Sequence, residues 1–546
     1  MVDLFKITTF FLLLSFGSKA QQDWAFPLAG KISLTGNYAE VRPNHFHAGL
    51  DFKTDPVKNL PIYAVASGYV SRIKVSTHGY GKALYITHPN GKVSVYGHQQ
   101  QYNDVIRKYV ESAQDSQQTF EIELFPKPNE LPVKQGDIMG YSGNTGDSEG
   151  PHLHFEIRDE KSEVPLNPLR FLKIPDTIAP KINLIAFYED DYTKPTINVV
   201  SLNPKKEEDT VIVSTKFGIG IVCGDQETKY GNWNNIYKAE LLLDGKRFYS
   251  HTLDSIPFDL ARYVNTYCDY EIKKKAKTKV QKCFVGKNND LPIYSCDKNK
   301  GFVYLDDTLY HKLTIKVYDF NKQSDEVTRV IKRKAATKEK PFSILPLNCL
   351  NPYIRSTGDY YLEIPAKSFY TDVAMNDSFA GGKLFLYAKN YEVPLQRSCT
   401  LSVKCNDNLT KYAEKLCLAE VSGKEASYSG GNLENGNVKA TVKNFGTYKV
   451  SLDTIVPKSK FIQPKKKKIY KTGDILSFKV SDEFSGIGKF KLTINDVFQL
   501  AEYEHKSGMI FFKLRETGPK GKVKVKLELE DKKGNRIDTE VNLTIE

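Results

Sequence analysis

Short stretches of alternating apolar and polar residues, separated by turns, make up most of the chain. Residues 83–87 and 93–96 alternate in this way on either side of an Asn90-Gly91 dipeptide. Asn-Gly between two alternating runs is a strong signal for a β-hairpin. Residues 61–73 continue the two-residue period. The pattern therefore predicts a mainly β protein.

One segment departs from this two-residue period. Its apolar residues recur at helical spacing, and they are Val105, Ile106, Tyr109, Val110 and Ala113. Asn103 and Asp104 come directly before them and can cap a helix. We expect a helix inserted beside the sheet. It would serve either as a wall or lid of a substrate groove or as a plain packing element.

A weak internal repeat marks where later domains begin. The sequence DTIAPK at 176–181 returns as DTIVPK at 453–458. Alternating strands follow each copy, and the two segments close alike, with Asp319 before Asn321 and Asp531 before Gly534-Asn535. Strands at this spacing, with turns between them, predict β-sandwiches.

The chain is thus predicted to be mainly β, with an N-terminal antiparallel β-sheet domain that carries a helical insertion, followed by two to three β-sandwich domains. The expected N-terminal domain covers 21–175, and β-sandwich domains cover 176–335 and 453–546. A further β-rich domain covers 341–452. The charged segment 332–340 precedes Pro341 and is predicted to be a linker.

The first twenty residues predict the compartment. Lys6 precedes an apolar stretch from Phe10 to Phe16, and Ser18 and Ala20 place small residues where a signal peptidase cuts. Residues 1–20 are therefore a predicted secretory signal, too short for a membrane span of about 20 apolar residues. No later stretch is apolar enough to cross a bilayer, so we expect an exported protein, in the periplasm or at the cell surface or outside the cell.

The net charge and the cysteines limit the kinds of partner and metal site that the sequence predicts. The formal net charge of +13 favours anionic partners. The basic runs at 273–275 and 465–468 lack the interleaved aromatic residues that stack on bases, so no nucleic-acid partner is expected. The eight cysteines lie in the middle of the chain and form no CxxC pair, which argues against a cysteine zinc site. An exported protein can oxidise them, and their pairing stays open.

The histidines are the main functional signal, because seven of the ten fall between residues 45 and 154. His47 and Asp51 are four residues apart, so in a strand they share one face, with no side chain at Gly49 between them. An imidazole and a carboxylate placed in this way suit zinc. His152 and His154 share a strand face in the same manner.

Three motifs occur in a fixed order: H-x-x-x-D at 47–51, a lone histidine after a strand at 98, and H-x-H at 152–154 within GPHLHFE. With the stretches 133–137 and 143–146, they resemble the lysostaphin-type (LytM-like, M23) zinc peptidases over roughly residues 24–172. The later segments resemble, more weakly, bacterial immunoglobulin-like domains, which usually act as spacers or binding modules.

The resemblance implies a role for each motif residue. His47, Asp51 and His154 would bind one Zn²⁺ and leave a fourth position for water, as a catalytic site requires. His98 and His152 would not bind the metal. They would act as general base and as hydrogen-bond donor to the oxyanion, with His152 favoured as the base. The implied reaction is hydrolysis of an amide in peptidoglycan cross-links or stem peptides.

Three functions follow as hypotheses. The first is a secreted zinc endopeptidase that acts on peptidoglycan peptides, which the presence of all five motif residues favours. The second is a non-catalytic wall-binding regulator of other peptidoglycan hydrolases. The third is a surface adhesion protein with a structural zinc, in which His98 and His152 would have no task. His45 is expected to support the metal ligands from behind or to lie in a loop, rather than to bind the metal. His78 and His88 match no family role, and we expect them in exposed turns or as hydrogen-bonded core residues.

Overall fold

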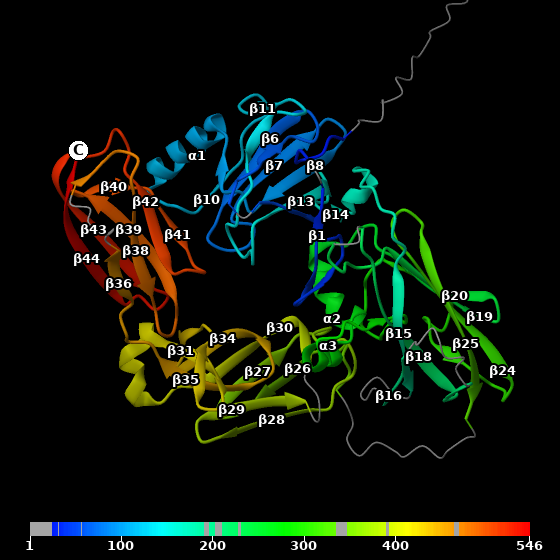
Figure 1. Ribbon diagram of the computed structural model, residues 1–546. Coiled ribbons are helices and arrows are strands. Elements are labelled where there is room, and N and C mark those ends of the chain that lie inside the picture. Colours follow the sequence, from blue (N-terminus) through cyan, green and yellow to red (C-terminus); the bar gives the residue numbers. More distant parts are fainter. Residues whose placement is uncertain are drawn as a thin grey trace, which may run out of the picture.

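The computed structural model describes residues 24–30, 32–55, 57–189, 196–201, 210–227, 231–334, 347–388, 393–462 and 469–546. Strands dominate this part of the chain, and helices are few and short (Figure 1). The prediction of a mainly β fold with several β domains is confirmed. The predicted secretory signal, the basic run at 465–468 and most of the predicted linker lie outside the described residues. No described helix is long and apolar enough to cross a membrane.

The N-terminal domain is a large antiparallel sheet with a smaller sheet and one helix beside it. Its elements are β1 (Leu34–Gly36), β2 (Val41–Arg42), β3 (His45–Phe46), β4 (Leu50–Lys53), β5 (Pro61–Tyr63), β6 (Gly68–Val75), β7 (Lys82–His88), β8 (Lys92–Gly97), β9 (Gln101–Tyr102), α1 (Asp104–Gln117), β10 (Ile122–Leu124), β11 (Pro132–Val133), β12 (Ile138–Tyr141), β13 (His152–Asp159), β14 (Pro165–Leu166) and a 3-10 helix (Pro168–Arg170). The main sheet has the order β1-β4-β13-β8-β7-β6-β10, with β11 beside β6 and β14 beside β13, and the smaller sheet has the order β5-β12-β9. The predicted hairpin is β7-β8, which turns at Asn90-Gly91.

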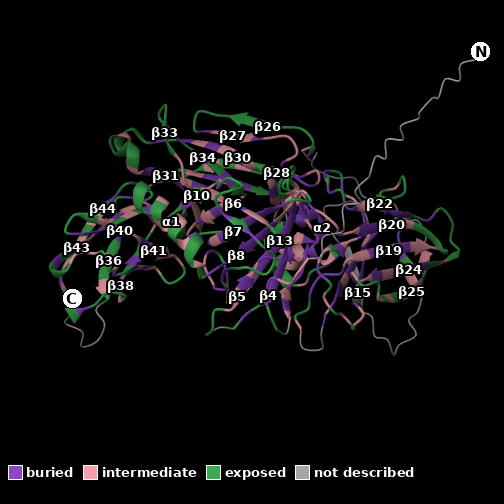
Figure 2. Ribbon diagram, turned by 90° about the horizontal axis from the view of Figure 1, so that it is seen from above, coloured by how far each residue is buried: buried purple, intermediate pink, exposed green. Residues whose placement is uncertain are grey.

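Strand β13 divides the domain into a core face and a site face. Leu153, Phe155 and Ile157 are fully buried in the core on one side of the strand. Because successive side chains of a strand point to opposite faces, His152 and His154 lie on the other side. Figure 2 shows buried residues along the central strands β13, β8 and β7. The apolar alternation of β13 thus fixes the direction in which its histidines point.

The helix lies where the sequence predicts it, and its packing is now defined. The Asn103 side chain accepts a hydrogen bond from the backbone N–H of Ile106 and caps α1. Ile106 and Val110 are buried in the domain core. Val105 differs from the prediction: it is 67% exposed, because neighbouring helix positions point about 100° apart and Ile106 takes the core side. This packing favours the interpretation of α1 as a packing element.

Three two-sheet units follow, each closed around its own apolar core. The first sandwich contains β15 (Lys181–Glu189), β16 (Thr196–Ser201), β17 (Val211–Val213), β18 (Lys216–Gly224), β19 (Lys238–Leu243), β20 (Lys246–Thr252), a 3-10 helix (Phe258–Tyr263), α2 (Val264–Tyr267), α3 (Tyr270–Ala276), β21 (Gln281–Lys282), β22 (Tyr294–Cys296), β23 (Val303–Tyr304), β24 (Tyr310–Tyr318) and β25 (Ser324–Arg333). Its sheets have the orders β16-β15-β18-β21, with β23 beside β18, and β17-β25-β24-β19-β20-β22.

The second and third sandwiches are built in the same way. The second contains β26 (Tyr353–Ser356), β27 (Tyr360–Ile364), β28 (Met375–Ala380), β29 (Lys383–Ala388), β30 (Pro394–Lys404), a 3-10 helix (Asp407–Lys415), β31 (Leu416–Ser422), β32 (Glu425–Tyr428), β33 (Asn432–Glu434), β34 (Asn437–Asn444) and β35 (Thr447–Leu452). The third contains β36 (Lys458–Ile462), β37 (Ile469–Tyr470), β38 (Ile475–Ser481), β39 (Ile487–Ile494), β40 (Val497–Gln499), β41 (Ala501–Glu504), β42 (Met509–Lys513), β43 (Gly521–Asp531) and β44 (Arg536–Ile545). The eight cysteines are all unpaired, and seven of them are buried.

The four units follow one another around a ring, so that the third sandwich returns to the N-terminal domain (Figure 1). Ion pairs between the third sandwich and the N-terminal domain close the ring. Arg515 pairs with Asp115 at the end of α1, and the Nζ atom of Lys82 lies 2.8 Å from the Glu502 carboxylate. Residues about 400 positions apart in sequence are therefore neighbours near the site face of the main sheet.

Candidate metal and catalytic site

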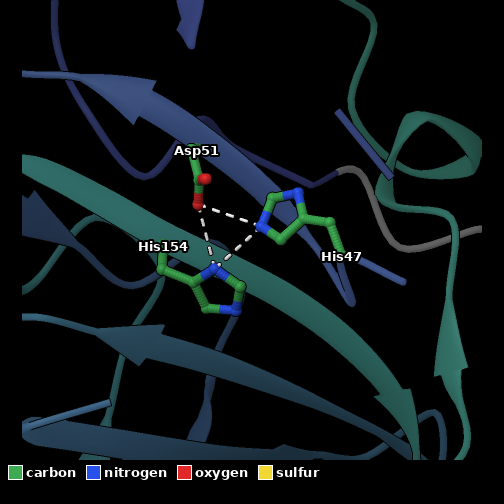
Figure 3. A group of neighbouring side chains, drawn as sticks. All are labelled: His47, Asp51 and His154. Carbon is green, nitrogen blue, oxygen red and sulfur yellow. Dashed lines mark hydrogen bonds and ion pairs between the residues drawn. The ribbon is translucent and has the colours of Figure 1, made fainter. Parts of the chain in front are cut away.

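The pairing of two strands brings the predicted ligands together. Strand β4 pairs with β13 in a register that places Asp51 opposite His154. His47 comes just before β4, and its side chain folds onto the same face (Figure 3). Gly49 between them is required by close packing, since a Cβ atom there would lie 2.2 Å from the carbonyl oxygen of Phe155. The glycine of the H-x-x-x-D motif therefore lets the two strands approach.

The three predicted ligands form one compact, buried group. The Asp51 Oδ1 atom lies 3.0 Å from His47 Nε2 and 2.9 Å from His154 Nδ1. The two imidazole nitrogens are 3.0 Å apart (Figure 3). Each residue is at most 4% exposed. Two imidazole nitrogens and a carboxylate oxygen converging in this way match the donors that Zn²⁺ prefers.

Hydrogen bonds on the far side of each ring orient the histidines toward this point. His47 Nδ1 lies 2.7 Å from the Asn37 carbonyl oxygen, which can only accept, so the ring proton sits on Nδ1. His154 Nε2 lies 2.7 Å from the Glu156 carboxylate and carries the proton there. In the neutral rings, His47 Nε2 and His154 Nδ1 thus turn lone pairs toward Asp51. This is the arrangement by which outer partners fix metal-binding histidines.

The electrostatics show that the group attracts positive charge. Burial alone would lower the pKa of His154, but hydrogen bonds to Asp51 and Glu156 outweigh it and raise that pKa to about 9. Burial opposes ionisation of Asp51, yet the neighbouring histidines hold its pKa well below the usual value. The three residues together therefore favour a bound positive charge. The residues present fit a bound divalent cation.

A buried chain of polar side chains supports His154. Glu156 lies two residues further along β13, and its Oε2 atom accepts a hydrogen bond of 2.6 Å from Arg158 Nε. The Tyr80 hydroxyl donates to the other Glu156 oxygen, and its ring stacks on His154 at 4.9 Å. Sequence reasoning assigned none of these a task, although the alternation of His152, His154, Glu156 and Arg158 along one face was readable.

Arg42 holds the second oxygen of the ligand carboxylate. Its guanidinium donates a short hydrogen bond to Asp51 Oδ2 and lies 3.4 Å from Glu40. Asp51 is thereby oriented with Oδ1 toward the histidines. Arg42 comes from the β2-β3 hairpin, and no sequence signal indicated it.

The two histidines predicted to be catalytic lie beside this group. The ring centroids of His98 and His152 are 4.7 Å apart, and His98 lies 5.8 Å from His154. His152 Nε2 is 3.4 Å from Asp51 Oδ1 and, among the described residues, is a buried atom without a hydrogen-bond partner. His152 Nδ1 faces the Gly150 carbonyl oxygen at 2.8 Å, so Nδ1 carries the proton and Nε2 presents a lone pair to the site.

His98 has the same proton arrangement. Its Nδ1 atom lies 2.7 Å from the Thr145 carbonyl oxygen, so Nδ1 carries the ring proton and Nε2 has the lone pair. Burial and the neighbouring His154 and His152 lower the pKa of His98 to about 3. His98 is therefore neutral near pH 7, with its proton on Nδ1. Its backbone is left-handed, with φ of 58°, as the chain leaves β8.

A single loop, residues 143–150, links both histidines to the third sandwich. Thr145 accepts from His98, and the Ser148 Oγ atom lies 3.2 Å from His152 Nδ1. From the other side, Lys506 Nζ donates to the carbonyl oxygens of Asn144 and Ser148, at 2.5 Å and 3.0 Å. The turn between β41 and β42 is therefore hydrogen-bonded to the loop that positions the two histidines.

The remaining histidines of the cluster lie outside the site. His45 is exposed on β3 and bonds to the Pro43 carbonyl oxygen. His88 is buried and bonded to Ser67 and Ser94. His78 is exposed and lies 3.1 Å from Asp147, which also contacts His505 of the third sandwich at 3.2 Å. The structure thus brings together the five predicted residues and leaves these others apart.

Comparison with known proteins agrees with this geometry. The family model "Peptidase family M23" matches residues 45–115 and 127–168, and the model "Zu5-like domain" matches residues 347–453. The DD-carboxypeptidase/endopeptidase Mpg of Neisseria meningitidis is 29% identical over 123 residues, 22% of each chain. Lysostaphin of Staphylococcus simulans is 26% identical over 136 residues, 24% of this chain and 23% of that one. This chain therefore matches only about a fifth to a quarter of the length of these curated relatives.

Among solved structures, the catalytic domain of lysostaphin from Staphylococcus simulans matches at 26% identity. That match covers 25% of this chain and 89% of that chain, with a TM-score of 0.19. A zinc containing peptidase from Vibrio cholerae matches at 23% identity over 27% of this chain and 39% of that one, with a TM-score of 0.20. The N-terminal domain therefore contains a region, within residues 45–168, that matches the M23 peptidase family and is similar in sequence to lysostaphin. The likeness of the later units to immunoglobulin-like domains stays a prediction.

Proposed function

We propose that this protein is an exported zinc metalloendopeptidase that hydrolyses amide bonds in peptidoglycan cross-links or stem peptides. His47, Asp51 and His154 would hold the Zn²⁺. The observation that carries the proposal is the convergence of three buried donor atoms, with the unpartnered His152 Nε2 atom 3.4 Å from Asp51 Oδ1. The similarity to Mpg, a DD-carboxypeptidase/endopeptidase by name, supports an amide bond of this kind as the substrate.

The chain's own residues supply proton transfer and orientation. A zinc ion held by the three ligands would act as a Lewis acid on the scissile carbonyl and lower the pKa of a bound water from 15.7 toward roughly 7. His152 would take the proton of the attacking water at Nε2, because that atom lies nearest to the ligand group. His98, the second histidine, would stabilise the developing oxyanion as a hydrogen-bond donor. Ser148 and Thr145 hold the two rings in place.

The test is digestion of purified peptidoglycan by the full chain, read out by mass spectrometry of the released fragments. The expected result is a set of new peptide fragments whose masses name the bond. Cleavage should stop when a chelator removes the metal and return when zinc is added back. A zinc-loaded chain that releases no fragment from peptidoglycan of several cross-link types would refute the proposal and leave the wall-binding or adhesion alternatives.

A further inference from the structure

A second group of candidate ligands lies where the first sandwich meets the N-terminal domain. Asp176 opens the sandwich, Asp225 directly follows β18, and Asp319 directly follows β24. Each offers a carboxylate oxygen, and these oxygens all lie within 4.8 Å of one another. Asp225 is 5% exposed and Asp319 is 2% exposed. A fourth carboxylate, Glu227, is also buried and adds to the same electrostatic field.

Basic side chains do not pair with these four carboxylates in the described part of the chain. Among the described residues, no lysine, arginine or histidine forms an ion pair with any of the four carboxylates. Burial, reinforced by the charges of Asp176, Asp319 and Glu227, raises the pKa of Asp225 to about 8. Burial also raises the pKa of Glu227 to about 7. Buried like charges of this kind must be neutralised by protons or by a bound cation.

Two buried oxygen atoms of this group, one of them a carboxylate oxygen, lack partners within the described ranges. They are Asp225 Oδ1 and Asn234 Oδ1, and Asn234 is 3% exposed. Asp225 and Asn234 face each other in an isolated antiparallel bridge, so their side chains leave the backbone on the same side. The Asn234 amide nitrogen donates to the Glu227 carboxylate at 2.9 Å. The unpartnered oxygens therefore belong to the same polar group as the carboxylates.

The internal repeat provides a comparison within the chain. In the third sandwich, Asp453 and Asp531 stand where the first sandwich has Asp176 and Asp319. There, however, Lys533 occupies the position of Asn321. Lys533 is 6% exposed, burial lowers its pKa, and its Nζ atom donates to the Gly431 carbonyl oxygen and to Asn432 Oδ1, each at 3.2 Å. The third sandwich thus buries a lysine at this position, where the first sandwich has the uncharged Asn321.

We propose that Asp176, Asp225 and Asp319, with Glu227 nearby, form a calcium site that braces the junction between the N-terminal domain and the first sandwich. The donors are all oxygen, which suits a hard cation, and Ca²⁺ accepts irregular sets of carboxylate and amide oxygens more readily than Mg²⁺. Zinc would favour nitrogen or sulfur donors, which this group lacks.

The site is connected to the N-terminal domain through the neighbouring residue Asn235. The Asn37 side chain donates to the Asn235 carbonyl oxygen at 2.7 Å and accepts from the Asn235 N–H at 3.1 Å. The Asn37 carbonyl oxygen in turn fixes the ring of His47. A cation that orders the segment around Asn234 therefore also supports one of the predicted zinc ligands, although the calcium inference does not depend on the proposed function.

The test is calcium titration of the full chain, zinc-loaded and stripped of calcium, by calorimetry and thermal unfolding. We expect one Ca²⁺ per chain with an affinity in the range of about 10⁻⁶ to 10⁻³ M, a higher unfolding midpoint, and weaker binding of Mg²⁺. Asp225→Asn and Asn321→Lys should each weaken binding by at least about tenfold, because one removes a ligand charge and the other supplies the lysine found in the third sandwich.

Asp482→Asn is the matched control, since Asp482 follows β38 in the third sandwich as Asp225 follows β18 in the first. It should leave calcium binding unchanged. The inference is overturned if the wild-type chain binds no Ca²⁺ at millimolar concentration, if Mg²⁺ binds as tightly, or if both Asp225→Asn and Asn321→Lys bind Ca²⁺ like the wild type. Asn321→Lys keeps the test decisive even if Asp225→Asn fails to fold.

Discussion

The Nε2 atom of His47 lies 3.0 Å from the Nδ1 atom of His154, and each ring carries its proton on the opposite nitrogen. Two lone pairs so close together repel each other unless a proton or a metal ion lies between them. The two rings come from segments about 100 residues apart and are held by different acceptors, Asn37 and Glu156. Those acceptors are therefore as important for metal binding as the ligands themselves.

Glu156→Gln should weaken zinc binding by about 10- to 100-fold, because it removes the charged acceptor that fixes His154. It should also lower the free energy of unfolding, since the buried Arg158 guanidinium loses its charge partner. Competition with a chelator measures the first effect and chemical denaturation the second. The exposed Glu160→Gln is the control. Unchanged zinc affinity in Glu156→Gln would show that the outer hydrogen bond is not required.

Gly49→Ala should separate β4 from β13 and disturb the ligand group. The new Cβ atom would lie 2.2 Å from the Phe155 carbonyl oxygen. Because that oxygen belongs to the backbone of β13, the clash can be relieved only by a shift of one of the two strands. We expect a loss of roughly 1–3 kcal/mol in unfolding free energy, as for overpacking in general, together with weaker zinc binding. Gly150→Ala is the matched control, because a Cβ atom there meets open space. Equal stability of the two variants would contradict this account of Gly49.

Lys506→Ala should loosen the loop at 143–150 without touching any predicted ligand. Its ammonium group donates to two carbonyl oxygens of that loop, which in turn orients His98 and His152. We expect faster amide hydrogen exchange in the loop, a lower kcat and unchanged zinc content. Lys520→Ala is the control, since Lys520 bonds to Thr472 and to Glu546 within its own sandwich. Unchanged exchange in Lys506→Ala would mean that the third sandwich does not order the loop.

The calcium-free chain should become less stable as the pH rises from about 4 to about 8. The folded pKa of Asp225 is about 8, above the ordinary carboxyl value of about 3.9, so the folded state binds this proton more tightly than the unfolded state. That contribution to stability is complete at low pH and is lost as the pH rises through 8. Denaturation at several pH values should show a shallower slope for Asp225→Asn and for the wild type with added calcium. Identical slopes would contradict the assignment of Asp225.

Local patterns predicted the strands, the helix and the shared strand faces of the motif residues, because each depends on spacing within a few positions, whereas the roles of the five site residues came from the family resemblance. The i, i+2 spacing places His152 and His154 on one face, and Asn103 caps α1 as its position indicated. Arg42 and Asn37 could not be predicted, since they act through contacts set by the path of the β2-β3 hairpin. The hydrogen bonds from Lys506 to the loop at 143–150 join residues more than 350 positions apart in sequence. A local sequence pattern cannot predict such a contact.

The most direct test of the central claim compares His47→Ala, His152→Ala and the exposed His45→Ala in the full chain. Zinc content and cleavage of purified peptidoglycan are measured on the same samples, with folding checked by circular dichroism. The account predicts that His47→Ala loses both zinc and cleavage, whereas His152→Ala keeps its zinc and cleaves about 10²- to 10⁴-fold more slowly. His45→Ala should match the wild type. Full zinc content and cleavage in His47→Ala, or wild-type cleavage in His152→Ala, would contradict it.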